Sequence, residues 1–87
     1  MKVSVVIMTK TKRKERVAEI IELVKKGYVL YTKYESFTFR NNKIYWWKPG
    51  LIDDEEFKID FEYHLEMLLC TSKGIIIDGY KMSIEIC

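Results

Sequence analysis

A cluster of cations precedes an apolar, periodic stretch and is the first group of side chains that could do chemistry. The cluster lies between residues 10 and 16 and consists of Lys10, Lys12, Arg13, Lys14 and Arg16. Cations at a helix N-terminus oppose the helix dipole by roughly 0.3–1 kcal/mol each, so this cluster works against the helix it begins. We expect Lys12, Arg13, Lys14 and Arg16 to contact phosphate or an acidic protein. The alternative is a solvated face that Glu15 or other acidic residues partly neutralise.

A second group interleaves cations with aromatic rings around Asn41-Asn42. This dipeptide is typical of a two-residue hairpin turn, because Asn tolerates the positive φ that a type I′ turn needs. The turn sets the register: Arg40 faces Lys43, Phe39 faces Ile44, Thr38 faces Tyr45 and Phe37 faces Trp46. One face of the predicted hairpin is therefore apolar, with Phe37, Phe39, Ile44 and Trp46. The other face presents Thr38, Arg40, Lys43, Tyr45 and Trp47.

The outer face of this hairpin has two possible uses. Arg40, Lys43, Tyr45 and Trp47 could stack nucleobases and neutralise phosphates. The same residue types are enriched at the energetic centres of protein interfaces. We expect a binding surface here, with a protein partner favoured over nucleic acid; the alternative is that a loop or the helix covers these rings. The sequence has no Gly-aromatic signature of an RNA-recognition motif, which counts against that motif.

Carboxylates form the third group. Asp53, Asp54, Glu55 and Glu56 have oxygen ligands but lack the spacing of a calcium loop, so we expect a surface for a basic partner and no metal. Further along, alternate positions of a predicted strand carry Asp60, Glu62, His64 and Glu66. We expect these side chains to pair with Arg40, Lys43 or Lys48 on a neighbouring strand, and not to hold a metal or shuttle protons.

The remaining reactive residues do not form a catalytic set. Cys70 and Cys87 lack metal-site spacing and are expected to be free thiols. Cys70 lies six residues from His64, about 20 Å along the predicted strand, and is too far away to act with it. No Ser-centred elbow, Gly-rich phosphate loop or Cys-x-x-Cys pair is present in the sequence. We therefore expect a protein that is not an enzyme and needs no cofactor.

Charge is divided along the chain. Residues 1–50 carry twelve Lys and Arg against four Glu, a net +8, whereas residues 51–87 carry three Lys against nine acids, a net −6. This division could steer a charged partner, or it could be used internally in ion pairs. The 87 residues suit one domain spanning 1–87. The apolar run near the N-terminus is too short for a signal sequence or a membrane span, so a cytoplasmic location without membrane contact is expected.

The elements that must position these groups begin with a short apolar strand at 3–9, which we expect at the centre of a sheet. An amphipathic helix follows at about 12–26, with Thr9 or Thr11 as N-cap and Gly27 as C-cap. Its apolar side is formed by Val17, Ala18, Ile20, Ile21, Leu23 and Val24. A strand from Tyr28 to Thr32 is predicted to run, with a bend near Glu35-Ser36, into the hairpin.

The segment from Glu55 to Leu69 admits two interpretations. Helix propensity favours a helix with Asp53 as N-cap. Strict alternation of apolar and charged residues from Phe57 to Met67 favours a long, half-exposed strand, because a helix would scatter those apolar residues around its circumference. We predict the strand. A further hairpin is predicted at Asp78-Gly79, between Ile75–Ile77 and a strand from Tyr80 to Ile86.

These elements predict an α+β fold in which one helix packs on a curled, mainly antiparallel β-α-β-β-β-β meander. That arrangement resembles cystatin-type rolls by analogy of architecture, without a shared motif. If residues 54–69 form a second helix, the element order is closer to a ferredoxin-like sandwich. A sheet edge at Val3 to Thr9 or at Tyr80 to Ile86 could also pair two copies as a homodimer.

Two functions are compatible with these observations. The first is a small, non-enzymatic protein-binding module that inhibits or modulates a larger partner, which could itself handle nucleic acid. The alternative is a nucleic-acid-binding domain that uses the basic helix entrance and the aromatic, basic face of the hairpin.

Overall fold

The computed structural model describes residues 3–6 and 10–87, with side chains from residue 12 onward. Within those residues, the elements in chain order are β1 (Val3–Val6), α1 (Lys10–Lys25), β2 (Val29–Tyr31), β3 (Ser36–Arg40), β4 (Lys43–Trp47), β5 (Glu55–Glu56), α2 (Phe61–Thr71), β6 (Ile75–Asp78) and β7 (Ser83–Ile86). The strands form one sheet in the order β1-β6-β7-β2-β3-β4-β5. The fold is therefore a small α+β domain with two helices packed on a mixed sheet.

The expected helix at 12–26 is confirmed as α1. Its buried side chains Val17, Ile20 and Val24 follow the helical period and face the sheet. Gly27 ends the helix with φ of 113°, while Tyr28 N–H donates to the Leu23 carbonyl and Gly27 N–H donates to the Val24 carbonyl. This pair of bonds is the Schellman arrangement, which needs a residue that adopts positive φ at position 27. The helix begins at Lys10, so Thr11 is not its N-cap, and Thr9 lies outside the described residues.

The prediction that residues 57–67 form a long strand is wrong. Residues 61–71 form α2, and Asp60, not Asp53, caps it, because the Asp60 carboxylate accepts hydrogen bonds from Glu62 N–H at 3.1 Å and Tyr63 N–H at 3.3 Å. The helix buries Leu65 and Leu69, with Phe61 and Leu68 partly buried on the same side. No charge needs to be buried, because Tyr63 and Met67 are left exposed to solvent instead.

The arrangement of strands also differs from the predicted meander. β2 pairs with β3 in an antiparallel manner but with β7 in a parallel one, so strands from distant parts of the chain meet at the centre of the sheet. β1 pairs only with β6 and lies at an edge, not at the centre, and β7 is internal, so Tyr80 to Ile86 does not provide a free edge. Neither the cystatin-type roll nor the ferredoxin-like sandwich is confirmed, although the second helix of the latter alternative is present.

Of the predicted turns, the one at Asn41-Asn42 is confirmed, whereas two others differ in detail. Asn41 and Asn42 have φ of 53° and 61°, and the β3–β4 register is the predicted one. The chain does not bend through Glu35-Ser36 but reverses between Thr32 and Glu35, where Thr32 N–H donates to the Glu35 carbonyl. The β6–β7 turn is longer than predicted: the Asp78 carboxylate accepts from the backbone N–H groups of Tyr80 and Lys81, and β7 starts only at Ser83.

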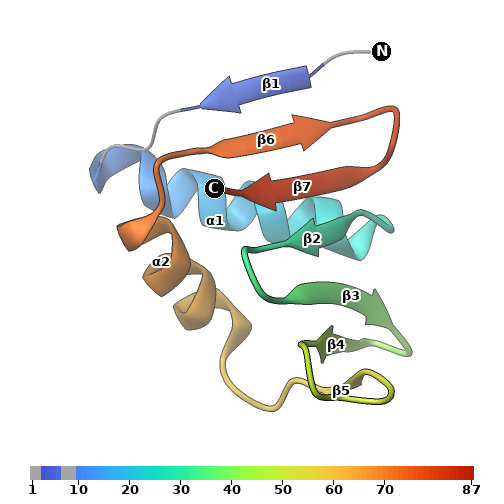
Figure 1. The fold of residues 1–87 in the computed structure, drawn as a ribbon. Coiled ribbons are helices and arrows are strands. Elements are labelled where there is room, and N and C mark those ends of the chain that lie inside the picture. The colour runs from blue at the N-terminus through green and yellow to red at the C-terminus, as the bar shows by residue number, and fades with distance from the viewer. Residues whose placement is uncertain (1–2, 7–9) are drawn as a thin grey trace.

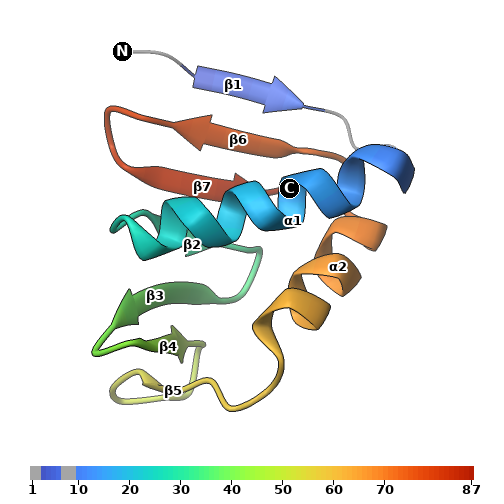
Figure 2. The ribbon, with the colours of Figure 1, turned by 180° about the vertical axis from the view of Figure 1, so that it is seen from behind.

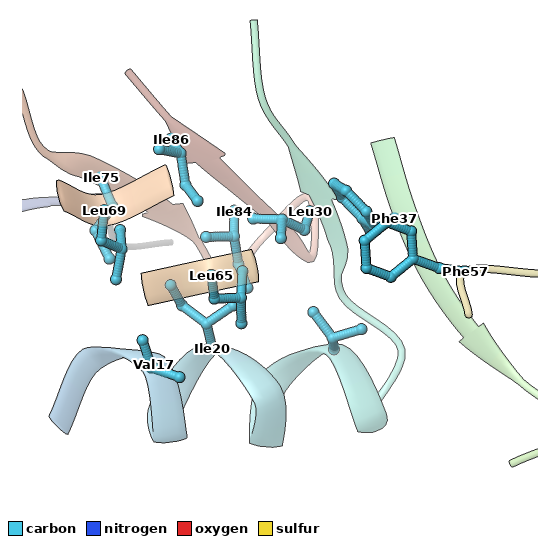
Figure 3. Packing of buried hydrophobic residues seen from close by; sticks show 11 residues of the cluster. Val17, Ile20, Leu30, Phe37, Phe57, Leu65, Leu69, Ile75, Ile84 and Ile86 are labelled. Carbon is cyan, nitrogen blue, oxygen red and sulfur yellow. The ribbon is translucent and has the colours of Figure 1, made fainter. Parts of the chain in front are cut away.

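Both helices cover the same face of the sheet. Figure 2 shows α1 crossing in front of β7 and β2 with α2 beside it, whereas in the opposite view of Figure 1 the strands lie in front of α1. Figure 3 shows the core between these layers, where Ile20 from α1 and Leu65 from α2 meet Leu30 and Ile84 from the sheet. The other face of the sheet is left without a covering helix among the described elements.

Replacement of one α2 residue distinguishes the helix from a strand. We expect Leu65→Ala to lower the free energy of unfolding by about 2–5 kcal/mol, because Leu65 is fully buried. Met67→Ala should change it by less than about 0.5 kcal/mol, because Met67 is 55% exposed. Urea denaturation followed by circular dichroism measures both. A strand would place the two side chains on one face, so similar losses for both variants would contradict the helix.

The cap of α2 provides a second test. Asp60→Ala removes the acceptor of two backbone hydrogen bonds and should cost about 0.5–2 kcal/mol of stability. Asp53→Ala is the matched control, since Asp53 is exposed and lies well before the helix. The same denaturation measurement applies. An equal effect of the two substitutions would show that the helix does not begin at Asp60.

Candidate functional site

The uncovered sheet face carries a row of side chains that alternate with the core residues. Leu30, Phe37 and Trp46 are register partners on the covered side, so their neighbours in sequence point the other way. The register therefore places one row across five strands on the uncovered face, consisting of Ile76, Glu85, Tyr31, Ser36 and Trp47. Tyr31 is 46% exposed and Trp47 is 40% exposed. Large aromatic rings are thus available at the surface on a rigid sheet.

A cavity of about 300 Å³ lies between these rings. Its lining is formed by the β2–β3 turn and the end of β4: Tyr31, Thr32, Lys33, Tyr34, Glu35, Ser36, Trp47 and Pro49. The Trp47 indole is held in place because its Nε1–H donates to the Leu51 carbonyl at 3.0 Å. Lys33 Nζ lies 5.4 Å from the centre of the Tyr34 ring. Three aromatic rings and Pro49 thus line the cavity, together with one cation, Lys33, and one carboxylate, Glu35.

Arg40 contacts both an aromatic ring and a carboxylate of its own chain, while its side chain remains 47% exposed. Its guanidinium lies 3.7 Å from the centre of the Tyr45 ring and donates two hydrogen bonds to the Asp54 carboxylate, at 2.6 and 2.8 Å. These hydrogen bonds are the main reason that the pKa of Asp54 is lowered and the pKa of Arg40 is raised from their ordinary values, while the weaker effect of desolvation opposes both shifts. Arg40 therefore acts here as a bridge between the hairpin and the acidic segment.

Lys43 extends this bridge. Its Nζ lies 3.6 Å from Glu56 Oε1, and Glu56 is the register partner of Tyr45 through the β4–β5 pairing. The predicted basic face of the hairpin and the predicted acidic surface are therefore one continuous surface, on which two cations meet two carboxylates. Asp53 and Glu55 remain exposed, and neither forms an ion pair within the described part of the chain.

The basic helix entrance is a separate surface. It lies at the opposite end of the molecule from the β3–β4 turn in both views (Figures 1 and 2). Lys12 Nζ lies 3.8 Å from Glu15, and Arg16 donates to Glu19 at 2.6 Å, so intrahelical pairs offset part of the charge. Lys14 is exposed, and the Arg13 Nε is buried without a hydrogen-bond partner. The structure thus divides the predicted binding residues into two groups and does not bring them together.

His64 occupies a different position from the predicted one. On α2 its ring packs 4.9 Å from the Phe57 ring and 5.6 Å from the Phe37 ring, and its Nε2 lies 3.8 Å from Glu35. Because residues 61–71 are helical, the side chains of Asp60, Glu62 and Glu66 are not aligned along one face, as they would be on a strand. In the side chains from residue 12 onward, no three His, Cys, Asp or Glu residues gather as a potential metal site. Cys70 and Cys87 are exposed and unpaired, as the sequence predicted.

The sequence did not indicate a groove at the β5 end of the sheet. Its volume is about 650 Å³, and its lining consists of Trp46, Glu55, Glu56, Phe57, Lys58 and Ile59. The sequence also did not indicate that Tyr31 and Tyr34 belong to the aromatic cavity. Tyr31 could have been found from its alternation with Leu30 and from an antiparallel pairing of β2 with β3, which places it opposite Ser36 and on the same face as Trp47.

Comparison with known proteins finds no matching family model, no matching curated protein and no matching solved structure. For the residues that the structure describes, neither helix is long and apolar enough to cross a membrane. The function must therefore be inferred from the surfaces themselves.

The bridge between Arg40 and Asp54 predicts a pH dependence. The folded-state pKa of Asp54 lies below its unfolded value of about 3.9, so the ion pair stabilises the protein fully above that value and its contribution is lost as the pH falls through the folded pKa. The urea midpoint of wild type should exceed that of Asp54→Asn at pH 7, and the difference should shrink as the pH is lowered below about 3.9. Asp53→Asn is the matched control, for which we expect no such convergence. A pH-independent difference for Asp54→Asn would contradict the pairing.

Proposed function

We propose that this protein is a small, non-enzymatic protein-binding module that docks on a larger partner and thereby inhibits or modulates it. The observation that carries the proposal is the pair Tyr31 and Trp47, both about half exposed on an uncovered sheet face and both lining one cavity. Trp and Tyr are the residue types that contribute most to binding at protein interfaces, because large rings bury much area with few rotatable bonds.

The ionic groups around these rings support a protein partner over nucleic acid. Arg40 and Lys43 already contact Asp54 and Glu56, so phosphate groups would have to compete with carboxylates for the hairpin cations. Glu85 is exposed and is the register partner of Tyr31, which places a negative charge beside the most central ring. A phosphate backbone crossing this face would be repelled there.

The alternative of nucleic-acid binding is favoured by one arrangement, the Arg40 guanidinium stacked on the Tyr45 ring next to Trp47. Bases stack on such rings with little dependence on sequence. Fluorescence titration of Trp46 and Trp47 with single-stranded and duplex DNA and RNA, at low and physiological salt, addresses it directly. A saturable, salt-sensitive change that is lost in Trp47→Ala would support this alternative against the protein-binding module.

The protein-binding module is tested with Tyr31→Ala and Trp47→Ala, using Tyr63→Ala as the matched control. Tyr63 is 59% exposed but lies on α2, away from the uncovered face. Affinity capture from the source organism should retain a protein on wild type and on Tyr63→Ala that is lost with the other two variants. Calorimetric titration of that purified protein should then show at least about 30-fold weaker binding for Trp47→Ala, corresponding to roughly 2 kcal/mol.

The result that would overturn the proposal is equally specific. If every protein retained by wild type binds Tyr31→Ala, Trp47→Ala and Tyr63→Ala with the same affinity, the uncovered face is not a binding surface. Circular dichroism of each variant establishes that a loss of binding does not reflect a loss of fold.

A further inference from the structure

The outer side of β5 is a free edge of the sheet within the described chain. β4 pairs with its inner side, where Trp46 is the partner of Glu55 and Tyr45 is the partner of Glu56. Phe57 N–H donates to the Ile44 carbonyl at 2.8 Å. Since backbone groups alternate in direction along an antiparallel strand, the N–H and C=O of Glu56 point away from β4. These groups are available to another strand.

The groove of about 650 Å³ follows this edge. Five of its lining residues are consecutive, from Glu55 to Ile59, and Trp46 provides the remaining wall. Ile59 is 62% exposed, and Trp46 is half-buried with Lys48 Nζ 5.0 Å from its ring centre. A ligand in the groove would therefore run along an extended segment of backbone and meet apolar side chains on its way.

The charge of residues 53–62, which surround the groove, indicates the charge of the ligand that would bind there. Residues 53–62 contain six carboxylates and one lysine. Arg40 and Lys43 neutralise two of these carboxylates, those of Asp54 and Glu56. Asp53, Glu55, Asp60 and Glu62 then remain, against Lys58 in the groove wall and Lys48 over the Trp46 ring. The balance is a net charge of −2, with the exposed Glu55 in the wall itself. An acidic segment would be repelled here, whereas a basic one would be attracted.

We propose that the β5 edge binds a basic partner segment in extended conformation, which adds to the sheet as a further strand. Backbone hydrogen bonds to Glu56 would supply affinity, and alternate Lys or Arg side chains near Glu55 would supply specificity. The inference rests on the proposed function and deepens it, because it gives the chemistry of one segment of the partner. The edge is continuous with the uncovered face, since Glu56 is the register partner of Tyr45.

The experiment uses a short, end-blocked peptide of alternating Lys and Val as the probe. Nuclear magnetic resonance titration should show saturable binding, with the Glu56 amide protected from hydrogen exchange in the complex. A peptide of alternating Glu and Val should bind at least tenfold more weakly. A second control is the Lys-Val peptide N-methylated at alternate residues, chosen so that the backbone N–H groups facing the β5 edge are blocked. It should also bind at least tenfold more weakly, because it keeps the positive charge but loses these hydrogen-bond donors.

Charge reversal on the protein separates a local from a global effect. Glu55→Lys should weaken binding of the Lys-Val peptide at least tenfold. Glu22→Lys makes the same change in net charge at an exposed position of α1, a helix that does not line the groove, and should leave the affinity within about twofold. Equal weakening by the two variants would overturn the assignment of the groove as the site.

Other outcomes also decide the question. Undiminished binding of the N-methylated peptide, or an unprotected Glu56 amide, would overturn strand addition. A protein dimer in analytical ultracentrifugation that dissociates on Glu55→Lys would identify a second copy as the occupant and overturn the basic partner. If the Lys-Val peptide fails to bind while partner capture still depends on Tyr31 and Trp47, this inference fails and the proposed function stands. If the Lys-Val peptide fails to bind and partner capture does not depend on Tyr31 and Trp47, both this inference and the proposed function fail.

Discussion

The parallel pairing of β2 with β7 is the constraint on which the rest of the structure depends. It joins a block of strands from the middle of the chain, β2 to β5, to a block formed by β1, β6 and β7. Leu30 at this seam is fully buried, with Ile84 as its partner on one side and Phe37 on the other. Without that seam, each block would be a small sheet with too little apolar area to bury for independent stability.

The seam also determines where the chain can bind. Because α1 and α2 both lie on one side of the joined sheet, the side chains of the opposite side have no helix over them in the described structure (Figures 1 and 2). The hairpin cations are then balanced by the acidic segment through Arg40 with Asp54 and Lys43 with Glu56. On this surface, part of the charge division seen in the sequence is used internally. What remains for a partner is aromatic on the face and acidic at the β5 edge.

Sequence reasoning succeeded where structure is determined by near neighbours. The Asn41-Asn42 turn fixed the register of β3 and β4, and Gly27 fixed the end of α1, because each depends on backbone conformations that few residues adopt. It failed for α2, where alternation from Phe57 to Met67 imitated a strand. The adjacent Leu68 and Leu69 break that alternation and fit a helix, and Asp60 is a suitable cap, but both signals are weaker than six alternating positions.

The candidate site was only partly predictable for a related reason. The outer face of the hairpin followed from its turn, and internal pairing of acids with bases was one of the alternatives. The partners were predicted wrongly, because Arg40 and Lys43 pair with Asp54 and Glu56 and not with the carboxylates of residues 60–66. The shared face of Tyr31 and Trp47 follows from local pairings through Ser36, which the sequence reasoning did not extend to β2. The position of β5 at an edge depends on contacts between residues far apart in sequence, such as Leu30 with Ile84. No local pattern encodes these contacts.

The order in which strands join also has a consequence for biosynthesis. β6 and β7 are translated after every other described element, yet they hold β1 and β2 in the sheet. The core can therefore close only once residue 86 has left the ribosome, and until then the nascent chain exposes Leu30 and the apolar side of α1 to chaperones.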